Sequence, residues 1–69
     1  MRLSTRNQLA GTVTEITVGS VMTTVKIDVS GQTVTAAVTK EAVEELGLSV
    51  GSPVVALVKS TEVMLGVED

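Results

Sequence analysis

The chain contains no cysteine, no histidine and no aromatic residue among its 69 residues. Without cysteine it has neither a disulfide nor a thiolate ligand for a metal ion. Without histidine it lacks the most common metal ligand and general base. It also has no serine–base pair and no glycine-rich phosphate motif, so nothing in the sequence activates a nucleophile. The sequence therefore predicts a binding protein, not an enzyme, with no resident metal ion.

The missing aromatics and the net charge of −3 also disfavour nucleic acids as partners. Small barrels that bind single strands stack the bases on aromatic side chains in a basic groove, so an OB-type nucleic-acid binder is a remote alternative. No apolar run reaches the length of about 20 residues that a membrane-spanning helix needs, and Met1–Ser4 contains no signal segment. We expect a cytoplasmic protein without a membrane partner.

Hydrophobic residues make up 43% of the chain, and all of them are aliphatic. A core built from many small side chains in one short domain gives only marginal stability. This composition suits a sheet whose second face is covered by another subunit. We therefore expect a homo-oligomer, and a monomer with an ordinary small core is the alternative.

Apolar and polar residues alternate with period two in the first half of the chain, which is typical of strands. This pattern predicts three strands, over residues 9–18, 21–29 and 34–38. The apolar positions of the first strand shift phase at Thr14–Glu15, which indicates a β-bulge. Gly19–Ser20 and Ser30–Gly31 are the predicted turns.

The period changes at Thr39, where residues 39–47 predict a short helix. Thr39 is its expected N-cap and Gly47 its expected stop. Three apolar side chains should face the core: Ala42, Val43 and Leu46. The acidic residues are interpreted as a solvated face and not as a metal or acid–base site: Glu41, Glu44 and Glu45.

Two more strands are predicted, over residues 54–59 and 63–67. The first is apolar on both faces over Val54–Leu57, where we expect part of a subunit interface. Three strands, one short helix and two strands predict an all-β protein with one short helix, built as a five-stranded OB-like Greek-key barrel. An SH3-like barrel is the structural alternative.

Groups that bind anions are concentrated in three short segments. A tetrahedral dianion offers only acceptor oxygens, so its site needs several donors and one or two cations. Arginine donates from a planar fork, lysine adds a compact charge, and a helix start adds free N–H groups. The chain supplies these groups at Ser4 and Arg6, at Lys59 and Ser60, and at the helix start Thr39–Ala42.

The two ends of the chain carry the most distinctive motifs. Ser4–Gly11 reads S-T-R-N-Q-L-A-G, and Lys59–Gly66 reads K-S-T-E-V-M-L-G. Together with Thr35–Thr39 and Leu46–Gly51 between them, these motifs resemble the molbindins, the small Mop-type molybdate-binding proteins of the TOBE/Mop domain family. The resemblance covers residues 1–69, which we interpret as a single Mop/TOBE-like oxyanion-binding domain.

The resemblance implies an oxyanion site that is shared by two subunits. One subunit would contribute Ser4, Thr5, Arg6, Asn7, Lys59 and Ser60. The neighbour would contribute Thr39 and Ala42. Ala42 stands where many relatives have a serine, which removes one hydroxyl and leaves the backbone N–H. Asn7 also has a structural interpretation, in which it closes a turn or an interface.

A second, weaker candidate site lies at the predicted turn before the second strand. Some hexamers of the family bind anions there, and the corresponding residues are Gly19, Ser20, Val21 and Met22. Met22 stands where the family often has an asparagine, which weakens this prediction.

The function implied by the resemblance is cytoplasmic storage and homeostasis of molybdate or tungstate by a homohexamer, a trimer of dimers. The alternative is a ligand-sensing domain cut from a molybdate-transporter ATPase subunit or a molybdate-responsive regulator. Met1 directly before the first motif and Asp69 just after the last one favour a free-standing protein. Molybdate and tungstate have nearly the same size and charge, so the sequence does not discriminate between them.

Overall fold

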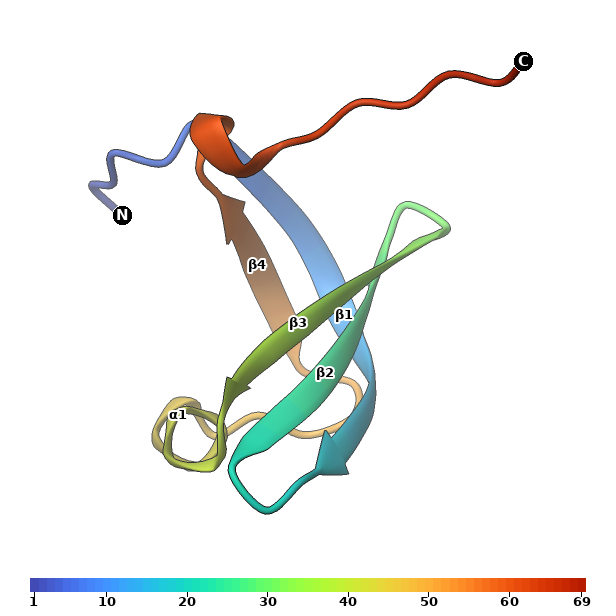
Figure 1. Cartoon of the computed structure of the whole chain (residues 1–69). Coiled ribbons are helices and arrows are strands. Elements are labelled where there is room, and N and C mark those ends of the chain that lie inside the picture. Colours follow the sequence, from blue (N-terminus) through green and yellow to red (C-terminus); the bar gives the residue numbers. More distant parts are fainter.

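A computed structural model describes residues 1–69 and shows one curled antiparallel sheet with a short helix (Figure 1). The strands run in the order β3-β2-β1-β4 across the sheet. Their bounds are β1 Asn7–Val18, β2 Met22–Val29, β3 Gln32–Thr39 and β4 Pro53–Val58. Between β3 and β4 in the sequence lies α1, Lys40–Leu46, and the 3₁₀ turn η1, Ser60–Glu62, follows β4. None of the helices has the length and apolarity to cross a membrane.

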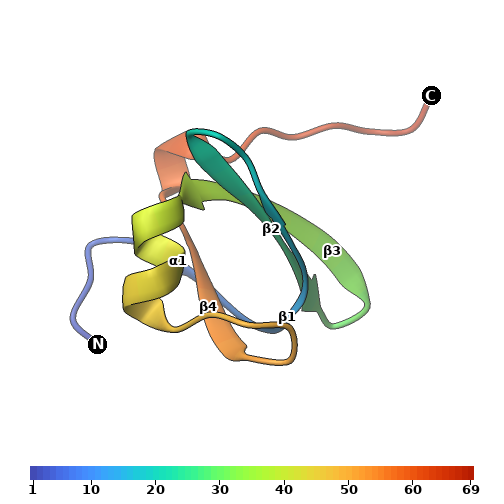
Figure 2. The same cartoon turned by 90° about the horizontal axis from the view of Figure 1, so that it is seen from below.

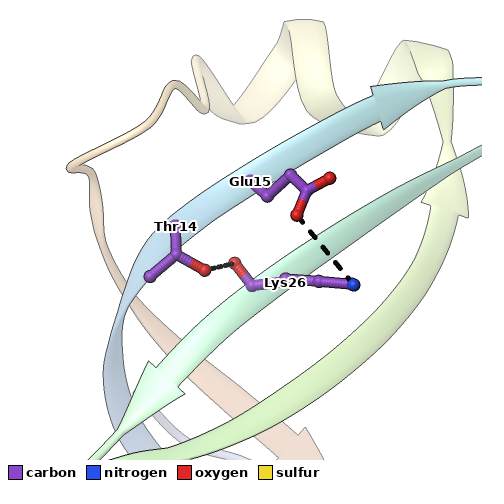
Figure 3. A network of polar contacts seen from close by, with 3 residues as sticks. All are labelled: Thr14, Glu15 and Lys26. Carbon is purple, nitrogen blue, oxygen red and sulfur yellow. Dashed lines mark hydrogen bonds and ion pairs between the residues drawn. The ribbon is translucent and has the colours of Figure 1, made fainter.

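The predicted bulge in β1 is confirmed. The register of β1 against β2 shifts between Val13 and Glu15, so Thr14 has no cross-strand partner. Its hydroxyl instead donates a hydrogen bond to the Lys26 carbonyl at 3.2 Å, and the Lys26 ammonium lies 3.9 Å from the Glu15 carboxylate (Figure 3). An extra residue in one strand bends it and increases its twist. The bulge therefore helps the long β1 to pair with β2 at one end and β4 at the other.

The two predicted hairpin turns are also confirmed. Ser30 and Gly31 both have positive φ, 50° and 87°, which is the backbone of a type I′ turn. The other turn is closed by the Gly19 N–H, which donates to the Met22 carbonyl at 3.0 Å. A Cβ at Gly19 would lie 2.4 Å from that carbonyl oxygen, so the turn needs a glycine there.

The helix begins and ends where the sequence predicts. Thr39 caps its start, and Gly47, with φ 63°, ends it in the left-handed conformation. Val43 packs against the core as predicted, but the prediction for Leu46 is wrong, because its side chain is 71% exposed. The Leu48 N–H returns to the Val43 carbonyl at 3.0 Å, a Schellman-type ending that folds the following residue back over the last turn. Leu48, not Leu46, is therefore the half-buried leucine at this end.

The core is small for the length of the chain. Only Val13, Val25, Ile27 and Thr23 are buried, and a ring of partly buried aliphatic residues surrounds the three apolar ones. The accessible surface is 5510 Å², whereas a compact monomer of this mass exposes about 4,100 Å². Much of the excess is apolar, because Val55, Leu57 and most of the C-terminal segment are exposed.

The predicted fifth strand, residues 63–67, is not formed, and the chain has four strands where five were expected. After η1 the segment carries no regular secondary structure and runs away from the sheet in both views (Figures 1 and 2). An extended segment becomes a strand only when an edge pairs with its backbone, and no edge of this chain does so. Because β3 and β4 are the two edges of the sheet, the barrel is left open between them.

Candidate functional site

The first predicted half of the site is organised by the end of the β1–β4 ladder. Asn7, the first residue of β1, is the cross-strand partner of Val58, the last residue of β4. The Asn7 side-chain amide also donates a hydrogen bond to the Val58 carbonyl at 3.0 Å. Asn7 therefore has the structural role that the sequence analysis gave as its alternative. It holds the residues before β1 and the residues after β4 at the same end of the sheet.

Arg6 and Lys59 each stand one residue outside this pair, so the two cations lie at the same end of the sheet. Both are exposed, together with Ser4 and Ser60. Neither has an acidic partner, because the only ion pair in the chain is between Lys26 and Glu15. Two neighbouring cations without a carboxylate repel each other and attract an anion.

Thr5 adds a hydroxyl to the same end. Its Oγ1 is shielded from solvent and has no hydrogen-bond partner, although its carbonyl accepts a long hydrogen bond, 3.4 Å, from the Gln8 side chain. On the other strand, the Lys59 carbonyl accepts from the Glu62 N–H at 2.9 Å, and this bond closes η1. This end of the sheet therefore carries two cations and three hydroxyls that can donate: those of Ser4, Thr5 and Ser60.

The second predicted half, at Thr39, lies at the other end of the sheet. Thr39 pairs with Met22, beside the hairpin where Val18 of β1 pairs with Thr23 of β2. The whole of β1, which is twelve residues long, separates this end from Asn7. Figure 1 shows α1 at the end of the sheet opposite η1, and the view from below in Figure 2 brings α1 to the front. One chain therefore does not bring the two halves together.

One of the backbone N–H groups at the start of the helix already has a hydrogen-bond partner. Thr39 Oγ1 accepts a hydrogen bond from the Ala42 N–H at 3.1 Å, so Ala42 reaches an anion only by releasing this cap. The first N–H groups of a helix have no partner within it, and here these include the N–H groups of Lys40 and Glu41. Of the backbone donors in the predicted helix start Thr39–Ala42, those of Lys40 and Glu41 are therefore the ones that the Thr39 cap leaves available.

The second, weaker candidate site adjoins the same helix start. A hollow of about 410 Å³ is lined by Ser20, Val21, Thr39, Lys40 and Glu41. The fold thus brings the Gly19–Met22 turn beside Thr39. The Glu41 carboxylate on its wall opposes an anion, and the anion site at this turn stays a prediction.

Comparison with known families identifies the domain. The family model of the TOBE domain matches residues 3–65. The chain belongs to the TOBE domain family. This TOBE domain is 48% identical over 69 residues to the probable molybdenum-pterin-binding protein of Haemophilus influenzae, a match that covers 99% of this chain and 100% of that one.

Solved structures of similar proteins share the fold. The molybdate-binding protein from Sporomusa ovata superposes with a TM-score of 0.91 at 43% identity. The match covers 94% of this chain and 97% of the Sporomusa chain. The cytoplasmic molybdate-binding protein ModG, solved with molybdate bound, gives a TM-score of 0.92 at 46% identity. This TOBE domain matches ModG over 99% of its own length but covers only 49% of the ModG chain. The predicted resemblance to the molbindins is confirmed.

Proposed function

We propose that this TOBE domain binds a tetrahedral dianion, molybdate or tungstate, and that it acts by binding and not by catalysis. The observation that carries the proposal is the position of Arg6 and Lys59, two cations without acidic partners that flank the Asn7–Val58 pair at one end of the sheet. A dianion between them would meet charge-assisted donors on both sides. The similarity to proteins named for molybdate or molybdenum binding supports the choice of anion.

The proposed site lies between subunits. One subunit contributes Ser4, Thr5, Arg6, Asn7, Lys59 and Ser60, and its neighbour contributes Thr39 and Ala42. The position of these groups at opposite ends of one sheet supports this division. The unused donors at Lys40 and Glu41 extend the neighbour's half. The assembly that we propose is a homohexamer, a trimer of dimers.

The physiological role that we propose is storage and homeostasis of the oxyanion in the cytoplasm. The Haemophilus relative, which is named as a probable molybdenum-pterin-binding protein and is matched over its whole length, supports a binding role. The alternative is a ligand-sensing domain of a longer protein, and ModG, of which this domain covers 49%, shows that a similar domain can be part of a longer chain. Nucleic-acid binding remains disfavoured by the net charge of −3 and the absence of aromatics.

Isothermal titration with molybdate, tungstate, sulfate and phosphate tests the proposal, together with the mass in solution from light scattering. We expect saturable binding of molybdate and tungstate by an assembly larger than a dimer. A protein that gives no heat with either oxyanion contradicts the proposed function. A monomer at micromolar concentration, with or without the oxyanion, contradicts the proposed site between subunits.

A further inference from the structure

Two side-chain hydroxyls are shielded from solvent and have no hydrogen-bond partner, those of Thr5 and Thr23. A polar group that is removed from water and left unpaired destabilises the folded chain. Thr23 lies within β2, and its side chain is fully buried in the core. Thr5 lies before β1, outside the helices and strands, and is half-buried as a whole. Of the two unpaired hydroxyls, only that of Thr5 therefore lies where a ligand can approach the chain.

Thr5 lies at the end of the sheet that carries the two unpaired cations. The Asn7–Val58 pair makes the segments before β1 and after β4 leave the sheet at the same end (Figure 1). Arg6 follows Thr5 directly and Lys59 follows Val58, and neither cation forms an ion pair. A hydroxyl that has no acceptor within the protein, in a region of positive charge, is an available donor for an anion.

The other two hydroxyls at this end differ from that of Thr5 in their hydration. Ser4 and Ser60 are exposed. An exposed hydroxyl exchanges a hydrogen bond to water for one to the anion, so its net contribution to binding is small. The Thr5 hydroxyl has already lost its water in the free chain. It gives up no hydrogen bond when an anion arrives, so the full strength of the new bond contributes to affinity.

We propose that Thr5 is the hydroxyl that determines how tightly this site holds its oxyanion. Its Oγ1 donates a hydrogen bond to an oxygen of the dianion, and this contact contributes more to affinity than the contacts of Ser4 and Ser60. The inference rests on the proposed function and ranks the ligands of the proposed site. It also links binding to stability, because the anion pairs a group that the free chain leaves unpaired.

Calorimetric titration with molybdate tests the ranking in four variants of the full chain. Thr5→Val removes the hydroxyl and keeps the branched shape, whereas Thr5→Ser keeps the hydroxyl. We expect Thr5→Val to weaken molybdate binding by about tenfold or more, the usual effect of losing a hydrogen bond to a charged group. Thr5→Ser should bind within about threefold of the parent. Ser4→Ala and Ser60→Ala should each weaken binding by about threefold, the lower range for an exposed hydrogen bond.

Urea unfolding at fixed protein concentration gives a second readout with the opposite sign. Without oxyanion, Thr5→Val should unfold at a higher urea concentration than the parent, because it removes an unpaired polar group. Added molybdate should raise the midpoint of Thr5→Val less than that of the parent, because the variant binds more weakly. Thr23→Val is the matched control. It removes the other unpaired hydroxyl, so it should also raise the midpoint but keep the parent's affinity for molybdate.

Three outcomes overturn the role of Thr5. Thr5→Val binds molybdate like the parent, or no more weakly than Ser4→Ala and Ser60→Ala. Thr5→Ser loses as much affinity as Thr5→Val, which makes the shape of the side chain responsible and not its hydroxyl. Thr5→Val unfolds at a lower urea concentration without oxyanion, which shows that the hydroxyl has a partner in the free protein. Each of these results, in a parent that binds molybdate, leaves the proposed function intact, whereas a parent that gives no heat with molybdate or tungstate contradicts the proposed function itself.

Discussion

Asn7 and Val58 are joined twice, as cross-strand partners and through a 3.0 Å hydrogen bond from the Asn7 side chain to the Val58 carbonyl. The two residues are 51 positions apart in the sequence. This one pairing brings the first motif of the chain to the same end of the sheet as the last motif, with Arg6 just before Asn7 and Lys59 just after Val58. Asn7, for which the sequence allowed a structural role beside that of a ligand, holds this end of the sheet together.

Replacement of Asn7 by alanine should loosen this end of the sheet. We expect Asn7→Ala to lower the free energy of unfolding by about 1 kcal/mol, since it removes one partly buried hydrogen bond, and to weaken molybdate binding with Arg6 and Lys59 intact. Urea unfolding at fixed protein concentration measures the first effect and titration the second. Gln8→Ala is the control, because its exposed 3.4 Å contact with Thr5 should contribute little. Equal behaviour of the two variants would contradict a special role for Asn7.

Removal of either unpaired cation should weaken anion binding while the fold survives. Loss of one charge-assisted contact to a desolvated anion should reduce the binding free energy by about 2–5 kcal/mol, for Arg6→Ala and for Lys59→Ala alike. The matched control is Lys26→Ala, which removes an exposed cation that is already paired with the Glu15 carboxylate (Figure 3). This variant should bind the anion like the parent. Calorimetric titration of the three variants measures the effect. If all three bind molybdate like the parent, the anion lies elsewhere.

If the site lies between subunits, two variants that each damage a different half of it should recover anion binding when they are refolded together. Arg6→Ala damages one half, and Thr39→Ala damages the other by removing the cap that holds the helix start. Refolding an equal mixture should leave both halves undamaged at about one quarter of the interfaces, by random pairing of subunits. Titration of the mixture against the two separate variants measures the recovered sites. No recovery after refolding would place the whole site within one chain.

Thr23 offers a test of the core that is independent of the ligand. Its side chain is fully buried, and its hydroxyl oxygen has no hydrogen-bond partner. An unsatisfied buried polar group costs about 1–3 kcal/mol, so Thr23→Val, which keeps the shape, should raise the free energy of unfolding by about 1 kcal/mol. Thr17→Val, at an exposed position of β1, is the control and should change stability little. A destabilised Thr23→Val protein would mean that the hydroxyl has a partner in solution.

The sequence alone determined the features that depend on close neighbours along the chain. Period-two alternation located β1, β2 and β3, and its change of phase located the bulge at Thr14. The Thr39 cap and the Gly47 stop bounded the helix because capping needs only the residues within one turn. The residue types in the motifs at the two ends of the chain likewise predicted an anion site, since serine, arginine and lysine side chains donate hydrogen bonds or carry positive charge.

Only the tertiary structure decided which of these pieces lie together. Leu46 has the right spacing for the core, yet the turn after Gly47 buries Leu48 in its place. Residues 63–67 have a strand's pattern but no strand partner in their own chain, because a strand is completed by an edge that the pattern does not specify. The register of β1 on β4 brought Arg6 and Lys59 to the same end of the sheet and left Thr39 at the other end. Such placements depend on contacts between distant residues, and a local pattern does not encode distance across a sheet.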